Sequence, residues 1–323
     1  MNSARSLRLA CDATAYSRPM STSPAPSILV TGATGGLGGA VAHHLSRLGV
    51  PFKMLIRDPA RAPEYPGGRA VIGSYEDADS LRAAMEPGDR VLMLSLHASR
   101  DTRMGLHHTF VDVARERRVG RILYLSSINA APDAVFWHAR SHGETEATLA
   151  ASGVPSGAVR MAMWAEQIGD WFDPDGRITG PGGDGRISLT SREEMGEAIA
   201  HLLAYPEKDD RDVVSITTPE AVTLGELAAM AREVSGRREL RYAPLTREEW
   251  LAYRRALGRQ EWSLQGGLTY YDGIAVGEHD VVTDDFARIV GRPPTPMRTL
   301  LERFRDQLLT GVQPGGAPGA IEP

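Results

Sequence analysis

A glycine-rich turn at residues 31–38, which reads TGATGGLG, restricts the fold of this chain more than any other feature of its sequence. An apolar run at 28–30 precedes the turn, and apolar residues at helical spacing follow it from 37 to 48. In a strand–turn–helix of this kind the glycines let the backbone approach a phosphate closely, and the start of the helix presents free N–H groups to it. The turn therefore predicts a dinucleotide-binding site.

Strand and helix patterns alternate along the first half of the chain. Short apolar runs that predict strands lie at 28–30, 52–56, 70–72, 91–96, 121–125 and 156–159. Helical patterns separate them at 37–48, at 79–85, in a longer stretch that ends near 118, and at 141–151. This alternation is typical of a parallel sheet with helices on both faces. We therefore expect an α/β fold: a doubly wound parallel sheet of the Rossmann type with a smaller C-terminal α/β substrate lobe.

The composition changes along the chain and suggests four segments. Residues 1–26 are rich in Ser and Thr without periodic apolar positions, and we expect a disordered N-terminal extension. Residues 27–160 carry the alternating pattern and form the expected nucleotide-binding domain. Residues 161–311 contain most of the aromatic residues and form the expected substrate-binding lobe, because aromatic side chains often line small-molecule pockets. The Gly- and Pro-rich residues 312–323 are expected to be a disordered tail.

Charge, cysteine content and hydropathy argue against several functional classes. The net charge is -5 and the sequence has no long basic stripe, which argues against nucleic-acid binding. The sequence contains one cysteine, Cys11, as expected for the reducing cytoplasm. Since no apolar run approaches about 18 residues, we expect no membrane span. The sequence leaves open whether the protein is a monomer or a homodimer.

The end of the second strand bears on which dinucleotide is bound. An acidic residue there usually binds the ribose 2′-hydroxyl of NAD, whereas an arginine accommodates the 2′-phosphate of NADP. In this chain Arg57 follows the strand and Arg61 lies nearby. Asp58 between them precedes a proline, which suits a turn or the start of a helix. We therefore expect NADP(H) as the cofactor, with NAD(H) as the alternative.

Several segments resemble the NmrA-like family of atypical short-chain dehydrogenases/reductases. The resemblance covers about residues 27–305 and includes TGATGGLG, IRDPAR at 56–61, GSYEDADSL at 73–81, LYLSSI at 123–128 and HGETEATLAASGVP at 142–155. It implies an NAD(P)-dependent oxidoreductase that acts on a small molecule. The family also includes regulators that sense NADP without turnover.

The resemblance also assigns roles to single residues. It implies that Arg57 binds the 2′-phosphate, that Ser74 lies near the adenine, and that Ser95, Leu96 and Ser126 line the nicotinamide half. Glu166 and Gln167 correspond to positions near the substrate pocket, and Trp164, Trp250 and Trp262 are further candidates for its lining. The residues expected in the pyrophosphate loop are Thr31, Gly32, Thr34, Gly35, Gly36, Leu37 and Gly38.

The expected catalytic residues depart from the usual short-chain reductase pattern, in which a Ser precedes Tyr-x-x-x-Lys. The corresponding residues here are 138–142, with His138 in place of the Tyr and His142 in place of the Lys. Ser126 remains a candidate for the Ser. The two histidines are four residues apart and share a helix face with Glu146. This face could be a polar surface, a proton donor or a metal site. We favour the first two, and His138 as the main donor.

The leading hypothesis is an NADPH-dependent reductase of a small, apolar, conjugated carbonyl or quinone-like molecule, of the kind found in secondary metabolism. Reduction of a quinone gives a phenolate-like anion with a pKa near 10, which needs less acid assistance than an alkoxide. The alternatives are a non-catalytic NADP sensor that binds a protein partner, and a cofactor-dependent isomerase or epimerase.

Overall fold

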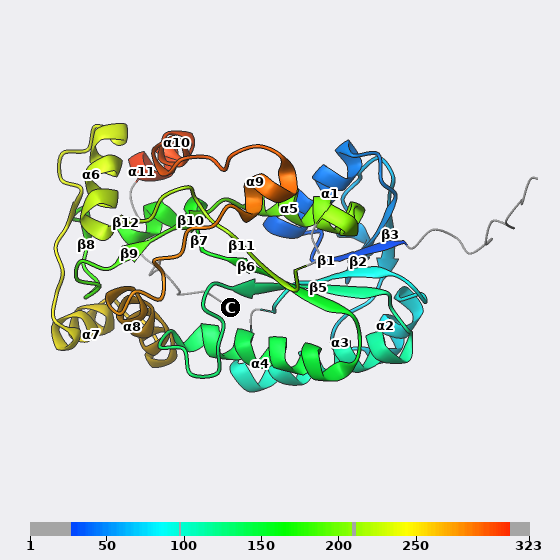
Figure 1. The fold of residues 1–323 in the computed structure, drawn as a ribbon. Helices are drawn as coiled ribbons and strands as arrows, with labels where there is room; N and C mark the ends of the chain where they lie inside the picture. Colours follow the sequence, from blue (N-terminus) through cyan, green and yellow to red (C-terminus); the bar gives the residue numbers. More distant parts are fainter. Residues whose placement is uncertain (1–26, 97, 209–210, 311–323) are drawn as a thin grey trace, which may run out of the picture.

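A parallel β-sheet forms the centre of the protein (Figure 1). The structure is a computed structural model that describes residues 27–96, 98–208 and 211–310. Within these residues the central sheet has seven strands in the order β11-β6-β5-β4-β1-β2-β3, with each neighbouring pair parallel. Its strands are β1 (Ile28–Thr31), β2 (Phe52–Ile56), β3 (Gly68–Ile72), β4 (Arg90–Met93), β5 (Arg121–Ser127), β6 (Ser156–Met161) and β11 (Val213–Ile216). The expected doubly wound sheet is confirmed, and the segments predicted at 1–26 and 312–323 lie outside the described residues.

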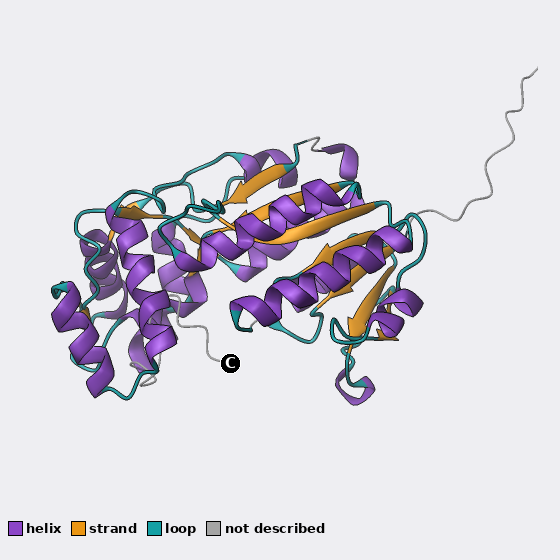
Figure 2. Ribbon diagram, turned by 90° about the horizontal axis from the view of Figure 1, so that it is seen from below, coloured by secondary structure: helices purple, strands orange, loops and turns teal. Residues whose placement is uncertain are grey.

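Helices cover both faces of the sheet, as Figure 1 and the view from below in Figure 2 show. On one face lie α1 (Gly36–Arg47), α5 (Arg192–Ala204) and α9 (Asp285–Val290). Their apolar side chains share one core cluster with β1 and β2. On the other face lie α2 (Ala78–Ala84), α3 (Arg100–Glu116) and α4 (Trp137–Ser152), in a second cluster. Burial on both faces explains why the strands are nearly continuous apolar runs.

The remaining helices gather at one end of the sheet, and we call this region the C-terminal lobe. Its helices are α6 (Leu224–Ser235), α7 (Arg247–Ala256), α8 (Glu261–Ala275), α10 (Met297–Arg303) and α11 (Arg305–Thr310). Two-residue strands accompany them: β7 (Met163–Trp164), β8 (Arg177–Ile178), β9 (Arg186–Ile187), β10 (Leu189–Thr190), β12 (Val222–Thr223) and β13 (Arg241–Tyr242). A third core cluster, rich in aromatic residues, fills the lobe.

The sequence predicted six strands, whereas the described sheet has a seventh, β11, which pairs with β6. This strand comes from beyond residue 160, and so does α5, which packs against α1. The layer around the nucleotide loop is therefore assembled from two separate stretches of chain. β1 lies between β2 and β4, and at such a reversal of strand order the carboxyl ends of the strands leave a crevice for a ligand.

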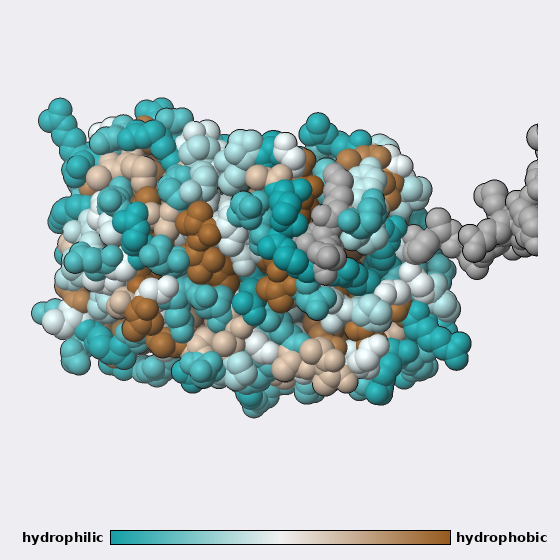
Figure 3. Space-filling view, in the orientation of Figure 1, coloured by the Kyte–Doolittle hydropathy of each residue, from teal (hydrophilic) through white to brown (hydrophobic). Residues whose placement is uncertain are grey.

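The surface in Figure 3 shows apolar residues in separate small groups among polar ones. The exposed large apolar side chains of the described residues likewise come from different elements: Ile72, Val213, Leu257, Val276, Val282 and Leu309. None of the described helices is both long enough and apolar enough to span a bilayer. The choice between a monomer and a homodimer stays a prediction.

A buried ion pair ties the amino ends of the strands together. Lys53 on β2 is almost fully buried, and its Nζ lies 2.6 Å from Oδ2 of Asp89 and donates to the carbonyl of Ala84 at 3.0 Å. The Asp89 carboxylate also accepts from the Ser27 hydroxyl and from the N–H of Glu86. Removing one partner from such a pair leaves an uncompensated charge in the interior.

We predict that Asp89→Ala lowers the free energy of unfolding by about 3–5 kcal/mol, because the buried Lys53 then keeps only the largely exposed Glu86 carboxylate, 3.4 Å from its Nζ. Urea denaturation measures this change. The exposed pair between Asp112 and Arg115 provides the control, since Asp112→Ala should cost about 1 kcal/mol or less. Equal effects of the two substitutions would show that the Lys53–Asp89 pair contributes no more than a surface pair.

Candidate functional site

The glycine loop has the geometry of a phosphate-binding turn. Gly32 has a φ of +66°, in the left-handed region that glycine adopts readily, and its carbonyl accepts from the N–H of Gly35 at 2.9 Å. α1 begins at Gly36, and no side chain caps its first turn. The N–H groups of that turn are therefore available to an anion, and the positive end of the helix faces it.

The glycines of the loop serve different purposes. A Cβ on Gly38 would lie 2.2 Å from the carbonyl oxygen of Gly32, so this residue lets α1 pack closely against the end of β1. A Cβ on Gly35 would meet nothing closer than the Gly32 oxygen at 3.4 Å. Gly35 thus leaves open space beside the exposed loop, as a cradle for a pyrophosphate requires.

Other residues of the loop are placed as follows. Thr34 is exposed, whereas Leu37 is buried in the core beneath α1. Thr31 is also buried, and its hydroxyl accepts from the N–H of Leu94 at 3.0 Å and from the Tyr75 hydroxyl at 3.2 Å. The Thr31 side chain therefore fastens the loop to the segment after β4.

The end of β2 presents cations to solvent. Arg57 and Arg61 are both exposed, and Asp58 caps the short 3-10 helix Pro59–Arg61 by accepting from the N–H of Ala60 at 2.9 Å. This confirms the turn role expected for Asp58. Ser74, after β3, is half-buried in a turn where its hydroxyl accepts from the N–H of Glu76 at 3.2 Å.

A cavity of about 250 Å³ opens at the carboxyl ends of β4, β5 and β6. Its walls combine apolar side chains with polar and charged ones, as a site for a small molecule can. The nucleotide-binding layer and the C-terminal lobe both contribute to it. The lining residues are Ser95, Leu96, Arg103, Leu125, Ser127, Ile128, Phe136, His138, His142, Met161, Ala162, Met163, Trp164, Gln167, Arg192, Tyr270 and His279.

His142 is held rigidly at the wall of this cavity. The Tyr124 hydroxyl on β5 lies within hydrogen-bond distance of its Nδ1, at 2.9 Å. Burial raises the pKa of Tyr124 to about 12, so the hydroxyl keeps its hydrogen at neutral pH. Burial, reinforced by the positive charge of Arg103, holds the pKa of His142 well below its ordinary value. The imidazole of His142 is therefore neutral.

A second buried histidine supports this arrangement. His107 lies on α3 and is fully buried. Its Nδ1 lies 3.0 Å from the Thr145 hydroxyl, and its ring packs edge-on against Tyr124. Burial lowers its pKa to about 3. The sequence could not reveal this, because the burial comes from α4 packing on α3.

His138 lies one helical turn before His142 and also lines the cavity. Its ring stacks on Trp137 at a centroid distance of 5.5 Å and meets Phe136 edge-on. Glu146, on the same face of α4, binds Arg160 at 2.6 Å. The histidines are thus brought together, while Glu146 belongs to an ion pair below them.

Ser126 is not part of the cavity wall. Its hydroxyl donates to Oε1 of Glu146 at 2.5 Å, and the side chain is fully buried. Ser127 lines the cavity instead. Successive side chains of a strand point to opposite faces, so a shift of one residue exchanges the two serines. The assignment of Ser126 as a catalytic candidate is corrected accordingly.

The predicted substrate residues separate into two groups. Trp164 and Gln167 line the cavity, and Glu166 lies beside it with Oε1 accepting from the N–H of Arg192 at 2.7 Å. Trp250 is buried in the core of the C-terminal lobe, edge-on to Tyr271, and its assignment to the pocket is corrected. The side chain of Trp262 lies outside the described part of the chain.

Several cavity residues were missed from the sequence, among them Arg103, Arg192, Tyr270 and His279. Tyr270 and His279 come from the C-terminal lobe, with ring centroids 4.4 Å apart. The Tyr270 hydroxyl and Nε2 of His279 are buried without a hydrogen-bond partner among the described residues. No sequence motif marks these positions, since only the packing of the lobe brings them to the strand ends.

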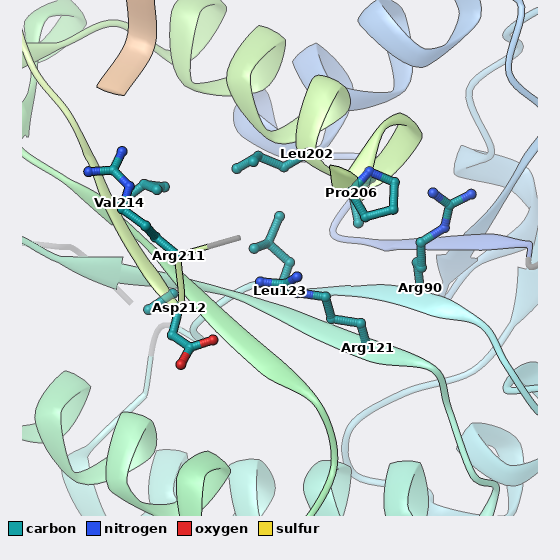
Figure 4. Close-up of a pocket in the computed structure, with 10 residues that line it drawn as sticks. Arg90, Arg121, Leu123, Leu202, Pro206, Arg211, Asp212 and Val214 are labelled. Atoms are coloured by element: carbon teal, nitrogen blue, oxygen red, sulfur yellow. The ribbon is translucent and has the colours of Figure 1, made fainter. Parts of the chain in front are cut away.

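A second hollow lies at the amino end of the sheet (Figure 4). Its volume is about 20 Å³, enough for little more than a water molecule. Arg90, Arg121 and Arg211 surround it, and Arg211 pairs with Asp285 at 2.5 Å. Its small size and its place at the amino ends of the strands make it a poorer candidate site than the cavity at the carboxyl ends.

The strand order, the glycine loop and the cavity define a dinucleotide-binding Rossmann protein. The NAD(P)H-binding family model matches residues 32–206, more than half of the 323-residue chain. The chain therefore belongs to the NAD(P)H-binding family.

Known proteins agree with this assignment. The chain is 28% identical to the NmrA-like family domain-containing oxidoreductase flvB of Aspergillus flavus, over 86% of this chain and 96% of that protein. It is 26% identical to the NAD(P)H azoreductase of Xenophilus azovorans, over 82% of this chain and 93% of that protein. The triphenylmethane reductase of Citrobacter sp. complexed with NADP(H) superposes with a TM-score of 0.74 at 26% identity, covering 86% of this chain and 100% of that one. The expected NmrA-like, atypical short-chain family and the class of NAD(P)-dependent oxidoreductases are confirmed.

We predict that Gly35→Val abolishes cofactor binding while the thermal unfolding midpoint of the free protein stays close to that of the parent. The added side chain meets no close neighbour in the fold but fills the cradle. Gly38→Ala is the matched comparison and should lower the midpoint by several degrees, because its Cβ clashes with the Gly32 carbonyl. Titration with NADPH and thermal unfolding measure the two effects. Full cofactor binding by a folded Gly35→Val variant would contradict this division of roles.

Proposed function

We propose that this protein is an NADPH-dependent reductase of a small, mostly apolar, conjugated carbonyl or quinone-like molecule. The proposal rests on the cavity at the strand ends near the glycine loop, which is lined by the neutral imidazole of His142. When bound, NADPH supplies a hydride to an electrophilic carbon. The residues of the chain have to position the substrate and stabilise the charge that develops on its oxygen.

The chemistry of the loop and of the β2 end fits this cofactor. The uncapped start of α1 and the open space at Gly35 suit the pyrophosphate. The exposed Arg57, next to an Asp58 that is occupied as a helix cap, suits the 2′-phosphate of NADP. Arg61 lies close enough along the chain to contribute.

His142 is the residue that we assign to the substrate oxygen. We assign the hydrogen of the neutral imidazole to Nε2, with Nδ1 accepting from the Tyr124 hydroxyl 2.9 Å away. An N–H donor of this kind stabilises an oxyanion by a hydrogen bond without transferring its proton. A quinone-like product anion, with a pKa near 10, can take its proton from water afterwards. This assignment replaces the sequence-based preference for His138.

The apolar walls define the rest of the substrate. Leu125, Ile128 and Phe136 offer no hydrogen bonds, whereas Trp164 and Tyr270 offer flat aromatic surfaces. A planar conjugated molecule fits such a lining better than a sugar, which needs many hydrogen-bond partners. Oxidation of NADPH by a panel of quinones, azo dyes and conjugated ketones tests the proposal. Tight NADPH binding without oxidation across the panel would favour the NADP-sensing alternative.

We predict that the protein binds NADPH at least about tenfold more tightly than NADH and that Arg57→Ala removes most of this difference. Loss of a charge-assisted hydrogen bond to the 2′-phosphate costs about 1.5–3 kcal/mol. Calorimetric titration of both cofactors measures it, with Arg61→Ala as a neighbouring comparison expected to have a smaller effect. Equal affinities of the parent for the two cofactors would contradict the role of Arg57.

We predict that His142→Ala slows NADPH oxidation by about tenfold or more, since one oxyanion donor is lost. His142→Gln, which keeps an N–H donor, should recover part of the rate. The rate should not titrate with His142 between about pH 5.5 and 9, because the lowered pKa keeps the imidazole neutral throughout. Single-turnover measurements across this range are required.

His138→Ala is the control for this prediction, and it should affect the rate less than His142→Ala. A rate that falls as the pH rises through about 6.5, and that loses this dependence in His138→Ala, would restore His138 as an imidazolium donor. That result would contradict the assignment of His142.

A further inference from the structure

Arg192 is fixed between the substrate cavity and the glycine loop. It is the first residue of α5, and its N–H donates to Oε1 of Glu166 at 2.7 Å. Its guanidinium carbon lies 5.2 Å from the ring centre of Trp164, within the range of a cation–π contact. The carboxylate and the indole therefore hold Arg192 in place, and Arg192 also lines the cavity.

The same side chain touches the start of α1. A Cβ on Gly36 would lie 3.0 Å from Cδ of Arg192 and 3.4 Å from its Nε. Arg192 therefore occupies the space that a side chain at position 36 would need. This contact brings a guanidinium to the first residue of the helix that binds the phosphates.

Two positive groups thus meet at this point. The uncapped start of α1 carries a partial positive charge, and Arg192 adds a full one. The compensation by Glu166 is incomplete, because its Oε2 lies 3.7 Å from Nη1 and has no hydrogen-bond partner among the described residues. An anion placed against both groups would balance the charge.

We propose that Arg192 is a second pyrophosphate-binding group of the cofactor site, acting together with the N–H groups of the glycine loop. A guanidinium can make two parallel hydrogen bonds to phosphate oxygens, which fixes orientation as well as affinity. Because Arg192 also lines the cavity, it separates the cofactor phosphates from the substrate. Position 36 is then glycine because Arg192 needs the space.

The first test is the affinity of Arg192→Ala for NADPH and NADH, measured by calorimetry. Both cofactors carry the pyrophosphate, so both affinities should fall by about 10–100-fold and to a similar extent. Arg57→Ala, in contrast, should affect NADPH alone. Arg192→Lys, which keeps the charge but loses the planar fork, should fall between the parent and Arg192→Ala.

Arg298→Ala is the control, because Arg298 is exposed and pairs with Glu233 in the C-terminal lobe. It should bind both cofactors like the parent. Thermal unfolding of the free Arg192→Ala variant establishes that the fold is retained. Unchanged affinity of Arg192→Ala for both cofactors would overturn the proposal, and so would a loss confined to NADPH. A higher KM for acidic substrates with normal cofactor affinity would also overturn it, since Arg192 would then bind the substrate.

A double-mutant cycle tests the contact with Gly36 directly. Gly36→Ala should displace Arg192 and weaken binding of both cofactors in the parent protein. In the Arg192→Ala background, Gly36→Ala should reduce the cofactor affinity much less, because the Arg192 side chain that it would displace is absent. Additive losses in the cycle would show that the two positions act independently and would contradict this part of the proposal.

Discussion

The close approach of α1 to the end of β1 sets the position of the glycine loop. This approach is possible because position 38 has no side chain. A second glycine allows another close contact, since a Cβ on Gly196 would lie 2.6 Å from Cβ of Ala40. Gly196 thereby lets α5 pack closely on α1, and this packing carries Arg192 to the loop. Two small residues, separated by more than 150 positions in the sequence, thus determine where the phosphates and the substrate can meet.

The cavity has two halves, one from the central sheet and its helices and one from the C-terminal lobe. β5 and α4 supply Tyr124 and His142, whose hydrogen bond depends on the central sheet. The C-terminal lobe supplies Tyr270 and His279 from α8 and the segment after it. A carboxylate links the halves, because Glu278 accepts from the N–H groups of Val135 and Phe136 just before α4. Substitutions in the lobe can therefore change one wall of the cavity while His142 stays in place.

The sequence predicted those parts of the fold that depend on local patterns. The bounds of β2 and the cap role of Asp58 follow from a short apolar run and from a proline, and the structure agrees with both. Ser126 failed as a candidate because the face of a strand residue depends on register. The burial of His107 and the arrival of Arg192 and Tyr270 at the cavity depend on which helices pack together. No local pattern of the chain encodes those contacts.

The buried histidines also limit the conditions under which this fold persists. Burial lowers the pKa values of His107 and His279 to about 3, below the ordinary value of 6.5. The unfolded chain therefore takes up protons on these residues as the pH falls below about 6.5, whereas the folded chain does not until near 3. Proton uptake favours unfolding across this interval, and His142 adds to the effect. Each of these neutral imidazoles therefore makes a contribution that destabilises the fold as the solution becomes acidic.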